Sequence, residues 1–376
     1  MKKETKCAHA GGFDKATGAL SVPIYQSATF KHTALGDDGE YSYSRLQNPT
    51  RQALENAVAE LEGGVGAIAF TTGMAAHVAL FELFSPGDHI IATEDIYGGT
   101  TRLLRTINKK NGVECSFVDT SDIKAIESAI TKNTKAIFIE TPTNPMMHVT
   151  SIVTTSKLAK KHGLKVIVDN TFLTPYYLQP LSLGADIVTH SGTKFLSGHN
   201  DTLAGFVVFK DKAVEEEVRY IAKTIGACLS PFDSWLLLRG LKTLPIRMDR
   251  SQENAQKIVE FLLGHKKVKK VYYAGLEDSK GYDIMKDEAS GFGSMISFEV
   301  DSHETVKQVL AGVKVIYFAE SLGGVETLVT FPSVQTHGDI PVEEKDKRGI
   351  NDRLLRLSIG IENVADLLDD LRVALG

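Results

Sequence analysis

Lys194 is the residue of this sequence whose surroundings most favour covalent chemistry. It lies in the run Asp186–His199, among apolar and small polar residues. A lysine in apolar surroundings can lose its charge, and the neutral amine is a nucleophile that can hold an aldehyde cofactor as a Schiff base. Upstream, the strand-like run Lys165–Val168 ends at Asp169, a carboxylate of the kind that a pyridinium nitrogen pairs with.

Four further residues stand just beyond strand-like runs, where side chains of an α/β protein can reach a ligand. Gly73 and Met74 open a helix-like segment after a strand, so their N–H groups form a place for a phosphate. Tyr97 follows the next strand and has a ring that can stack on a flat heteroaromatic. Asn144 again lies just past a strand, and its amide can donate to a phenolate.

Each of these residues also has an ordinary structural explanation. Glycine turns between strand and helix are common, a lone tyrosine is more often a packing residue, and Pro142 to Pro145 has plain turn chemistry. The candidates gain weight together, because parallel strands bring their carboxyl ends to one edge, where open α/β sheets bind ligands. We therefore expect the Gly73 turn, Tyr97, Asn144, Asp169 and Lys194 to converge at that edge.

Short β-branched runs alternate with segments of helical pattern along the first part of the chain, which is typical of an α/β fold. The expected strands are the runs at 66–70, 89–92, 136–139, 165–168, 186–188 and 206–209. The segment 151–162 ends in Lys160, Lys161 and His162 before Gly163. A basic last turn and a glycine stop predict a crossover helix there.

The pattern changes after about residue 240, which predicts a second, smaller α+β domain. Asp233 and Ser234 can cap an apolar helix, a second helical stretch follows at 251–263, and the runs 294–300 and 355–359 alternate as half-buried strands do. The first 45 residues are rich in Gly, Thr and Ser without a long periodic segment. We therefore expect an extended arm over 1–45, a ligand-binding α/β domain over 46–240 and an α+β domain over 241–376.

Composition narrows the class of protein. The chain has 376 residues, 43% hydrophobic and 24% charged, which matches a globular protein large enough for two domains. Its net charge of −5 gives no overall basic field, so nucleic-acid binding has no electrostatic support. There is no signal-peptide pattern and no apolar run of about 18 residues, so we expect a cytoplasmic protein without a membrane segment. Cys7, Cys115 and Cys228 are widely spaced, which indicates reduced thiols and neither a disulfide framework nor a metal site.

Taken together, these motifs resemble a known family, the pyridoxal-phosphate enzymes of cysteine and methionine metabolism. The family includes cystathionine γ-synthase, cystathionine γ-lyase, cystathionine β-lyase and methionine γ-lyase. The likeness runs from Val22–Phe30 to Arg356–Glu362 and so covers nearly the whole chain. It implies pyridoxal 5′-phosphate as the cofactor. It also implies the aspartate aminotransferase-like architecture of fold type I, in which a large domain with a mainly parallel sheet carries a smaller α+β C-terminal domain.

The resemblance implies a role for each cofactor-binding candidate. Lys194 would form the internal aldimine and shuttle protons, and Asp169 would pair with the protonated pyridine nitrogen. Tyr97 would stack on the ring, close enough to assist a leaving group. The other implied contacts are the amides of Gly73 and Met74 with Ser191 and Thr193 at the phosphate, and Asn144 near the ring oxygen.

Tyr43 and Arg45 match family residues that reach the phosphate of a neighbouring subunit. From the residues alone, an arginine in a Gly-rich arm is a plausible anion clamp but more often an ordinary surface residue. The resemblance therefore implies a homo-oligomer with shared active sites, at least a dimer and typically a tetramer.

Arg356 lies in an apolar, strand-like run, and a guanidinium seldom enters a core without a carboxylate to meet it. It is therefore either half of a structural ion pair or a receptor for a substrate carboxylate. The resemblance favours the receptor, with Ser321 helping to hold the same group and Asn144 nearby. It implies small amino-acid substrates such as cystathionine, cysteine and homoserine esters.

The residues leave the exact reaction open. Family members that act at Cγ commonly carry glutamate at the position of Glu320, which favours γ-replacement or γ-elimination by a cystathionine γ-synthase or γ-lyase. Glu320 can also be a solvated acid before a glycine turn. Methionine γ-lyases typically have a cysteine at the position of Gly99, so that activity is not expected. Cystathionine β-lyase, which forms homocysteine, pyruvate and ammonia, is the alternative, and a non-catalytic cofactor-binding regulatory protein is a remote one.

Overall fold

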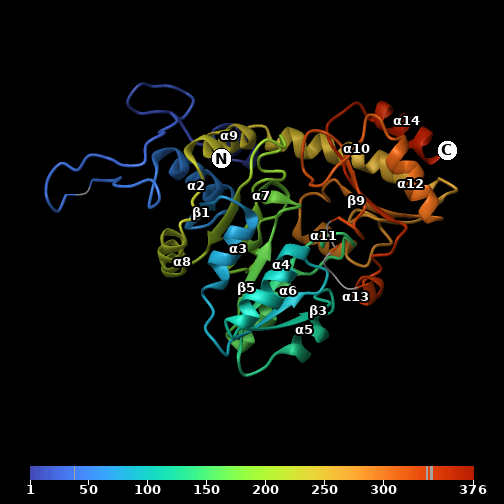
Figure 1. The fold of residues 1–376 in the computed structure, drawn as a ribbon, viewed down its shortest axis with the longest axis horizontal. Helices are drawn as coiled ribbons and strands as arrows, with labels where there is room; N and C mark the ends of the chain where they lie inside the picture. The colour runs from blue at the N-terminus through green and yellow to red at the C-terminus, as the bar shows by residue number, and fades with distance from the viewer. Residues whose placement is uncertain (38, 336–337, 339–341) are drawn as a thin grey trace.

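Two β-sheets lie in separate halves of the molecule (Figure 1). The structure is a computed structural model that describes residues 1–37, 39–335, 338 and 342–376. In this part of the chain the larger sheet has seven strands in the order β1-β7-β6-β5-β4-β2-β3, and only β7 runs against its neighbours. The strands are β1 (Gly66–Phe70), β2 (His89–Thr93), β3 (Glu114–Val118), β4 (Thr134–Glu140), β5 (Lys165–Asp169), β6 (Ile187–Ser191) and β7 (Gly205–Phe209).

The larger sheet is buried on both faces because its strands carry apolar residues at successive positions. In β4, Ile137 and Ile139 contribute to one hydrophobic cluster, whereas Ala136 and Phe138 contribute to another on the opposite face. Strands covered on both sides are near-continuous hydrophobic runs, as parallel sheets require. The covering helices are α2 (Pro49–Glu62), α3 (Gly73–Phe81), α4 (Gly98–Leu103), η1 (Leu104–Asn108), α5 (Ile123–Ala129), α6 (Ile152–His162), α7 (Thr174–Tyr177), η2 (Pro180–Leu183), α8 (Lys212–Ile225) and α9 (Pro231–Leu241).

The smaller sheet has its own core and lies toward the C-terminus (Figure 1). Its strands follow the order β10-β11-β12-β9-β8 in the described residues. They are β8 (Val268–Tyr272), β9 (Met295–Val300), β10 (Tyr317–Phe318), β11 (Leu328–Thr330) and β12 (Leu354–Ser358). The helices that accompany them are α10 (Leu244–Leu263), α11 (Tyr282–Glu288), α12 (His303–Gly312), α13 (Val342–Lys347) and α14 (Val364–Leu375).

The N-terminal segment is mostly exposed. After the short helix α1 (Lys3–Ala8), the blue chain loops away from the body before it returns at α2 (Figure 1). Along this segment Phe13, Leu20 and Leu35 are exposed by 60%, 80% and 107%.

The expected strands of the larger sheet are all present, and the fold class is confirmed. The crossover helix is α6, with Ser151 as N-cap and Gly163 in the left-handed conformation at the C-terminus. The prediction missed β3, an edge strand that is exposed or only partly buried and so lacks a clear apolar pattern.

The expected N-cap of α9 was wrong. Ser230 caps the helix, its hydroxyl accepting from the Asp233 N–H at 3.0 Å and donating to the Asp233 carboxylate at 2.7 Å. Asp233 is thus the third residue of the helix, where an acid completes a reciprocal cap. The second helical stretch, α10, begins at Leu244, seven residues before the expected 251, because Pro245 is tolerated in its first turn.

No helix in the described residues is both long and apolar enough to cross a membrane. Cys7, Cys115 and Cys228 are free thiols.

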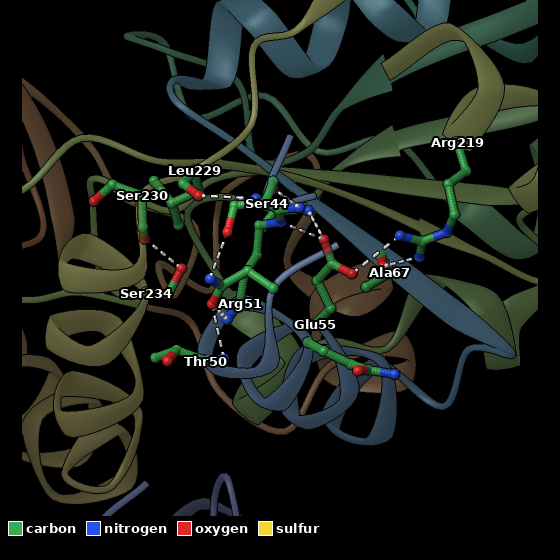
Figure 2. A network of polar contacts seen from close by, with 12 residues as sticks. Ser44, Thr50, Arg51, Glu55, Ala67, Arg219, Leu229, Ser230 and Ser234 are labelled. Carbon is green, nitrogen blue, oxygen red and sulfur yellow. Dashed lines mark hydrogen bonds and ion pairs between the residues drawn. The ribbon is translucent and has the colours of Figure 1, made fainter. Parts of the chain in front are cut away.

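A buried charge network joins α2 to β1, α8 and the returning arm. Figure 2 shows Arg51 between Ser44 and Glu55, and its guanidinium donates to the Ser44 and Leu229 carbonyls at 2.8 and 3.2 Å. Glu55 accepts from the Ala69 N–H at 3.0 Å and from Arg219 at 3.2 Å. The network fixes the end of the arm to the sheet that carries the candidate site.

Glu55→Ala should lower the free energy of unfolding by about 3–5 kcal/mol, because it leaves the buried Arg51 charge without a carboxylate and the Ala69 N–H without an acceptor. Urea denaturation followed by circular dichroism measures the change. The control is Glu253→Ala, which breaks an exposed pair with Arg250 and should cost about 0–1 kcal/mol. Equal effects of the two substitutions would contradict a structural role for the network.

Candidate functional site

The strands of the larger sheet deliver their candidate residues to one cavity of about 430 Å³. β1, β2, β4, β5 and β6 all end at the same edge because they run in the same direction. The cavity brings together most of the residues expected from the sequence: Gly73, Met74, Tyr97, Asn144, Asp169, Ser191, Thr193, Lys194, Glu320, Ser321 and Arg356. Among the described residues there is no group of three or more His, Cys, Asp or Glu placed to hold a metal ion.

Lys194 follows β6 in a turn, and its amine points across the cavity to the smaller sheet. Its Nζ donates to the Ser321 Oγ at 2.8 Å. Burial and, to a smaller extent, the positive charge of Arg356 lower the pKa of Lys194 to about 8, while Glu320 acts in the opposite direction. A substantial fraction of the amine is therefore neutral near physiological pH, as a nucleophile for an aldehyde must be.

Asp169 ends β5 with its carboxylate almost fully buried. Its Oδ1 accepts from the Thr171 N–H at 3.0 Å and from the Thr171 hydroxyl at 2.5 Å, and its Oδ2 lies 3.5 Å from the His77 Nε2. Burial alone would raise the pKa of Asp169, but His77 and Thr171 more than offset it and hold the pKa below its ordinary value. The residue is an anion suited to a protonated ring nitrogen.

The start of α3 forms a cradle for an anion. Thr72 caps the helix by accepting from the Ala75 N–H at 2.9 Å, which leaves the Gly73 and Met74 N–H groups at the cavity. A Cβ at Gly73 would lie 3.1 Å from the Ser191 Cβ, so a larger residue there would require Ser191 to shift by a few tenths of an ångström. Thr193 lines the cavity, but its hydroxyl exchanges hydrogen bonds with the Ala204 backbone at 3.0 and 3.3 Å.

Tyr97 precedes α4, and 42% of its surface is exposed. Its N–H donates to the Glu140 Oε2 at 2.9 Å. A Cβ at Gly99 would lie 2.5 Å from the Tyr97 ring and 2.9 Å from the Met74 sulfur, so a glycine is required for this ring position. Burial raises the pKa of Glu140 well above its ordinary range and the negative charge of Asp169 adds to the effect.

Arg356 on β12 brings a buried guanidinium to the cavity from the smaller sheet. It donates to the Asn144 Oδ1 at 2.7 Å and to the Ser321 carbonyl at 2.9 Å, while its Nε has no hydrogen-bond partner in the described residues. No carboxylate of the described residues forms an ion pair with it. Burial lowers its pKa to about 10, against the opposing charges of Glu140 and Glu320. These contacts do not support the structural ion pair, the first of the two explanations given above.

Two expected residues lie outside this cavity. Arg45 donates to the Lys223 carbonyl at 2.6 Å, and its guanidinium lies 5.5 Å from the centre of the Tyr43 ring, which is 44% exposed. In contrast, no role was predicted for His77 and Glu140, although both line the cavity. The only sequence signal for a role was the position of each residue. His77 is a polar residue inside an apolar helix, and Glu140 is an acid at the end of an apolar strand.

The residues present fit pyridoxal 5′-phosphate. Lys194 supplies an amine for its aldehyde, Asp169 an anion for its ring nitrogen and the start of α3 N–H groups for its phosphate. The class of protein defined by this fold and site is an α/β enzyme that uses a pyridine aldehyde cofactor.

The chain belongs to the Cys/Met metabolism PLP-dependent enzyme family, whose model matches residues 4–376. It is 48% identical over 376 residues to cystathionine gamma-lyase of Bacillus subtilis (strain 168), with 100% of this chain and 99% of that protein covered. It is 49% identical over 373 residues to cystathionine beta-lyase of Lactococcus lactis subsp. cremoris (strain MG1363), with 99% and 98% covered.

Solved structures agree with these relatives. The crystal structure of cystathionine gamma-lyase from Lactobacillus plantarum complexed with L-serine superposes with a TM-score of 0.98 at 47% identity, covering 100% of this chain and 98% of that one. Cystathionine gamma synthase from Xanthomonas oryzae pv. oryzae, in complex with aminoacrylate and cysteine, superposes with a TM-score of 0.98 at 40% identity and the same coverage. The protein is therefore an enzyme, and its cofactor is pyridoxal phosphate.

The pH dependence of cofactor capture should report the lowered pKa of Lys194. The rate at which cofactor-free protein captures pyridoxal phosphate should rise with pH through about 8, because only the neutral amine attacks the aldehyde. Arg356→Gln should move the midpoint to higher pH, since a nearby positive charge is removed. Borohydride trapping followed by mass spectrometry measures the product.

The control is Arg353→Gln, which changes an exposed arginine near β12 and should leave the midpoint in place. A wild-type midpoint near 10.5, the ordinary value for lysine, would show that burial does not act on Lys194 as inferred.

Proposed function

We propose that this enzyme makes or breaks the bond between sulfur and Cγ of cystathionine, as a cystathionine γ-synthase or γ-lyase. The observation that carries the proposal is Glu320, because family members that act at Cγ commonly carry glutamate at this position. Its carboxylate lines the cavity beside Ser321, and its charge acts on both Lys194 and Arg356. A carboxylate at this position can receive the ammonium of a substrate's distal amino acid, which a short substrate lacks.

Arg356 would hold the α-carboxylate of the substrate. A guanidinium presents parallel N–H donors that match a carboxylate, and burial strengthens that attraction. Asn144 and the Ser321 carbonyl fix the plane of the guanidinium at 2.7 and 2.9 Å. These contacts orient the substrate's Cα toward Lys194, whose Nζ is held by the Ser321 hydroxyl on the same loop.

Pyridoxal phosphate, when bound, supplies an electron sink for the pair released as Cα loses its proton. Lys194 is the base best placed to take that proton, since burial keeps its pKa near 8. The same amine would carry the proton that must leave Cβ in γ chemistry. Asp169, held anionic by Thr171 and His77, would keep the ring nitrogen protonated throughout.

β-Elimination by a cystathionine β-lyase is the second candidate, and a specific finding favours keeping it. Relatives at nearly the same identity carry the two names, 48% for the gamma-lyase and 49% for the beta-lyase. Both reactions need Lys194, Asp169 and Arg356 alike, so these residues do not discriminate between them.

The ketoacid released from cystathionine separates the reactions. Purified, cofactor-loaded enzyme should form cysteine, 2-oxobutyrate and ammonia if it is a γ-lyase, or cystathionine from cysteine and a homoserine ester if it is a γ-synthase. Glu320→Gln should raise KM for cystathionine about ten-fold, because it removes a charge-assisted contact. Coupled ketoacid assays with chromatographic identification measure both.

Glu216→Gln on α8, an exposed position away from the cavity, is the control and should leave KM unchanged. Pyruvate and homocysteine as the sole products would overturn the γ proposal in favour of the β-lyase.

We also propose that the active sites are shared between subunits of a homo-oligomer. Tyr43 and Arg45 lie outside the cavity of their own chain, and the arm that carries them exposes large apolar side chains. An arm that docks on a second copy would cover that surface and bring the Arg45 guanidinium to the neighbouring phosphate. A tetramer and a cytoplasmic location stay predictions.

Mixing two inactive variants tests the shared site. Subunits with Lys194→Ala and subunits with Arg45→Ala should regain up to about a quarter of wild-type activity after joint refolding, because one site of each mixed dimer is intact. Lyase or synthase turnover measures the recovery. Mixing Tyr43→Ala with Arg45→Ala is the control, since both changes fall on the arm and neither site is restored. No recovery in the first mixture would place the arm in its own subunit's site.

A further inference from the structure

His77 lies on α3, directly behind the carboxylate that ends β5. Its side chain is buried, and only 4% of the residue is exposed. The Nε2 is 3.5 Å from the Asp169 Oδ2 and 3.2 Å from the Thr189 Oγ1, whereas the Nδ1 is 3.0 Å from the Thr100 Oγ1. Both ring nitrogens thus have defined neighbours.

We propose that His77 is a positioning residue for the cofactor, which holds Asp169 as a carboxylate in the orientation that the pyridine nitrogen requires. This inference depends on the pyridoxal phosphate cofactor of the family and applies equally to β and γ chemistry.

The tautomer of His77 follows from the chemistry of its neighbours. The hydrogen-bond partner of the Nε2 is the Thr189 hydroxyl at 3.2 Å, and the Asp169 Oδ2 lies 3.5 Å away. Because a carboxylate only accepts hydrogen bonds, a hydrogen on the Nε2 is the tautomer that favours the Asp169 anion. The Thr100 hydroxyl can donate to the Nδ1, which makes a neutral Nε2–H ring sufficient. A neutral donor stabilises the buried Asp169 charge without adding a second buried charge that needs compensation.

The two oxygens of Asp169 are held by different elements. Thr171 on the following turn engages Oδ1 through its N–H and its hydroxyl, and His77 on α3 faces Oδ2. Two contacts on opposite oxygens fix the plane of the carboxylate, whereas the turn alone would leave rotation about its axis. His77 therefore contributes orientation as well as charge stabilisation.

The imidazole is itself immobilised by packing. The Phe138 ring meets it edge-on, with centroids 5.3 Å apart and planes at 84°, and Phe81 lies at 6.1 Å. Thr100 belongs to the first turn of α4, where its N–H donates to the Tyr97 carbonyl at 2.9 Å. His77 thus contacts Asp169 directly, and it contacts Thr100, which is hydrogen-bonded to Tyr97. Asp169 and Tyr97 both line the cofactor cavity.

His89 provides a matched control in the sheet that carries Asp169. It is 7% exposed, and its ring nitrogens lie 2.8 Å from the Thr134 Oγ1 and 2.9 Å from the Ser116 Oγ. It stands at the start of β2, at the end of the sheet opposite the cavity. A general effect of losing a buried, hydroxyl-bonded histidine would appear in both residues, whereas a cofactor effect would appear only in His77.

The test compares His77→Leu, His77→Gln and His89→Leu by spectroscopic titration of cofactor-free protein with pyridoxal phosphate. His77→Leu should raise the Kd for the cofactor about ten-fold, the size expected for a lost hydrogen bond to a charged group. The loss of affinity on acidification should begin at higher pH, because burial raises the pKa of Asp169 once His77 is gone. His77→Gln keeps a neutral donor and should recover part of the affinity.

Steady-state kinetics give a second readout. His77→Leu should lower kcat with little change in KM for the amino acid, and the identity of the ketoacid should not change. His89→Leu should lower the thermal midpoint and leave the cofactor Kd unchanged. If His77→Leu does not fold, His77→Gln and Thr100→Val, which removes the donor to Nδ1, take its place and should each weaken cofactor binding. A wild-type Kd and pH dependence in the His77 variants, or the same loss in His89→Leu, would overturn the proposal.

Discussion

The burial of three charged groups at one edge of the larger sheet is the constraint on which the rest of the site depends. A charge taken out of water is costly unless hydrogen bonds or opposite charges replace the lost hydration. Asp169 obtains this from Thr171 and His77, and Arg356 obtains it from Asn144 and a backbone carbonyl. Lys194 instead responds by a lowered pKa, which makes its amine reactive.

Ser321 connects the two sheets at the cavity. Its hydroxyl accepts from Lys194 after β6, and its carbonyl accepts from Arg356 on β12. The residue has a φ of +95°, a conformation that costs a side-chain-bearing residue energy and that persists only where surrounding contacts hold it. Lys194 and Arg356 therefore both contact Ser321. The distance between the two side chains depends on how the smaller sheet packs on the larger one.

Much of the fold was predictable because its signals are local. Buried parallel strands are apolar runs, and α6 carries its own cap and glycine stop, whereas β3 was missed because an edge strand is buried less. The strand-end candidates were predictable for the same reason, since direction alone brings strand ends together. His77 was not, because an imidazole within an apolar helix looks like a core residue until Asp169, distant in sequence, is placed beside it.

The sequence by itself determined the fold class, because periodicity acts over short stretches of chain, and its resemblance to a known family identified the cofactor. The residues proposed to contact that cofactor were predicted from their types and from their positions at the ends of strands. Tertiary structure decided which groups are solvated and which are paired. Among the described residues it gave Arg356 no carboxylate partner, left Tyr43 and Arg45 outside their own cavity, and placed Glu320 where its charge acts on Lys194. These outcomes depend on desolvation and on contacts between residues from both sheets, which no local pattern encodes.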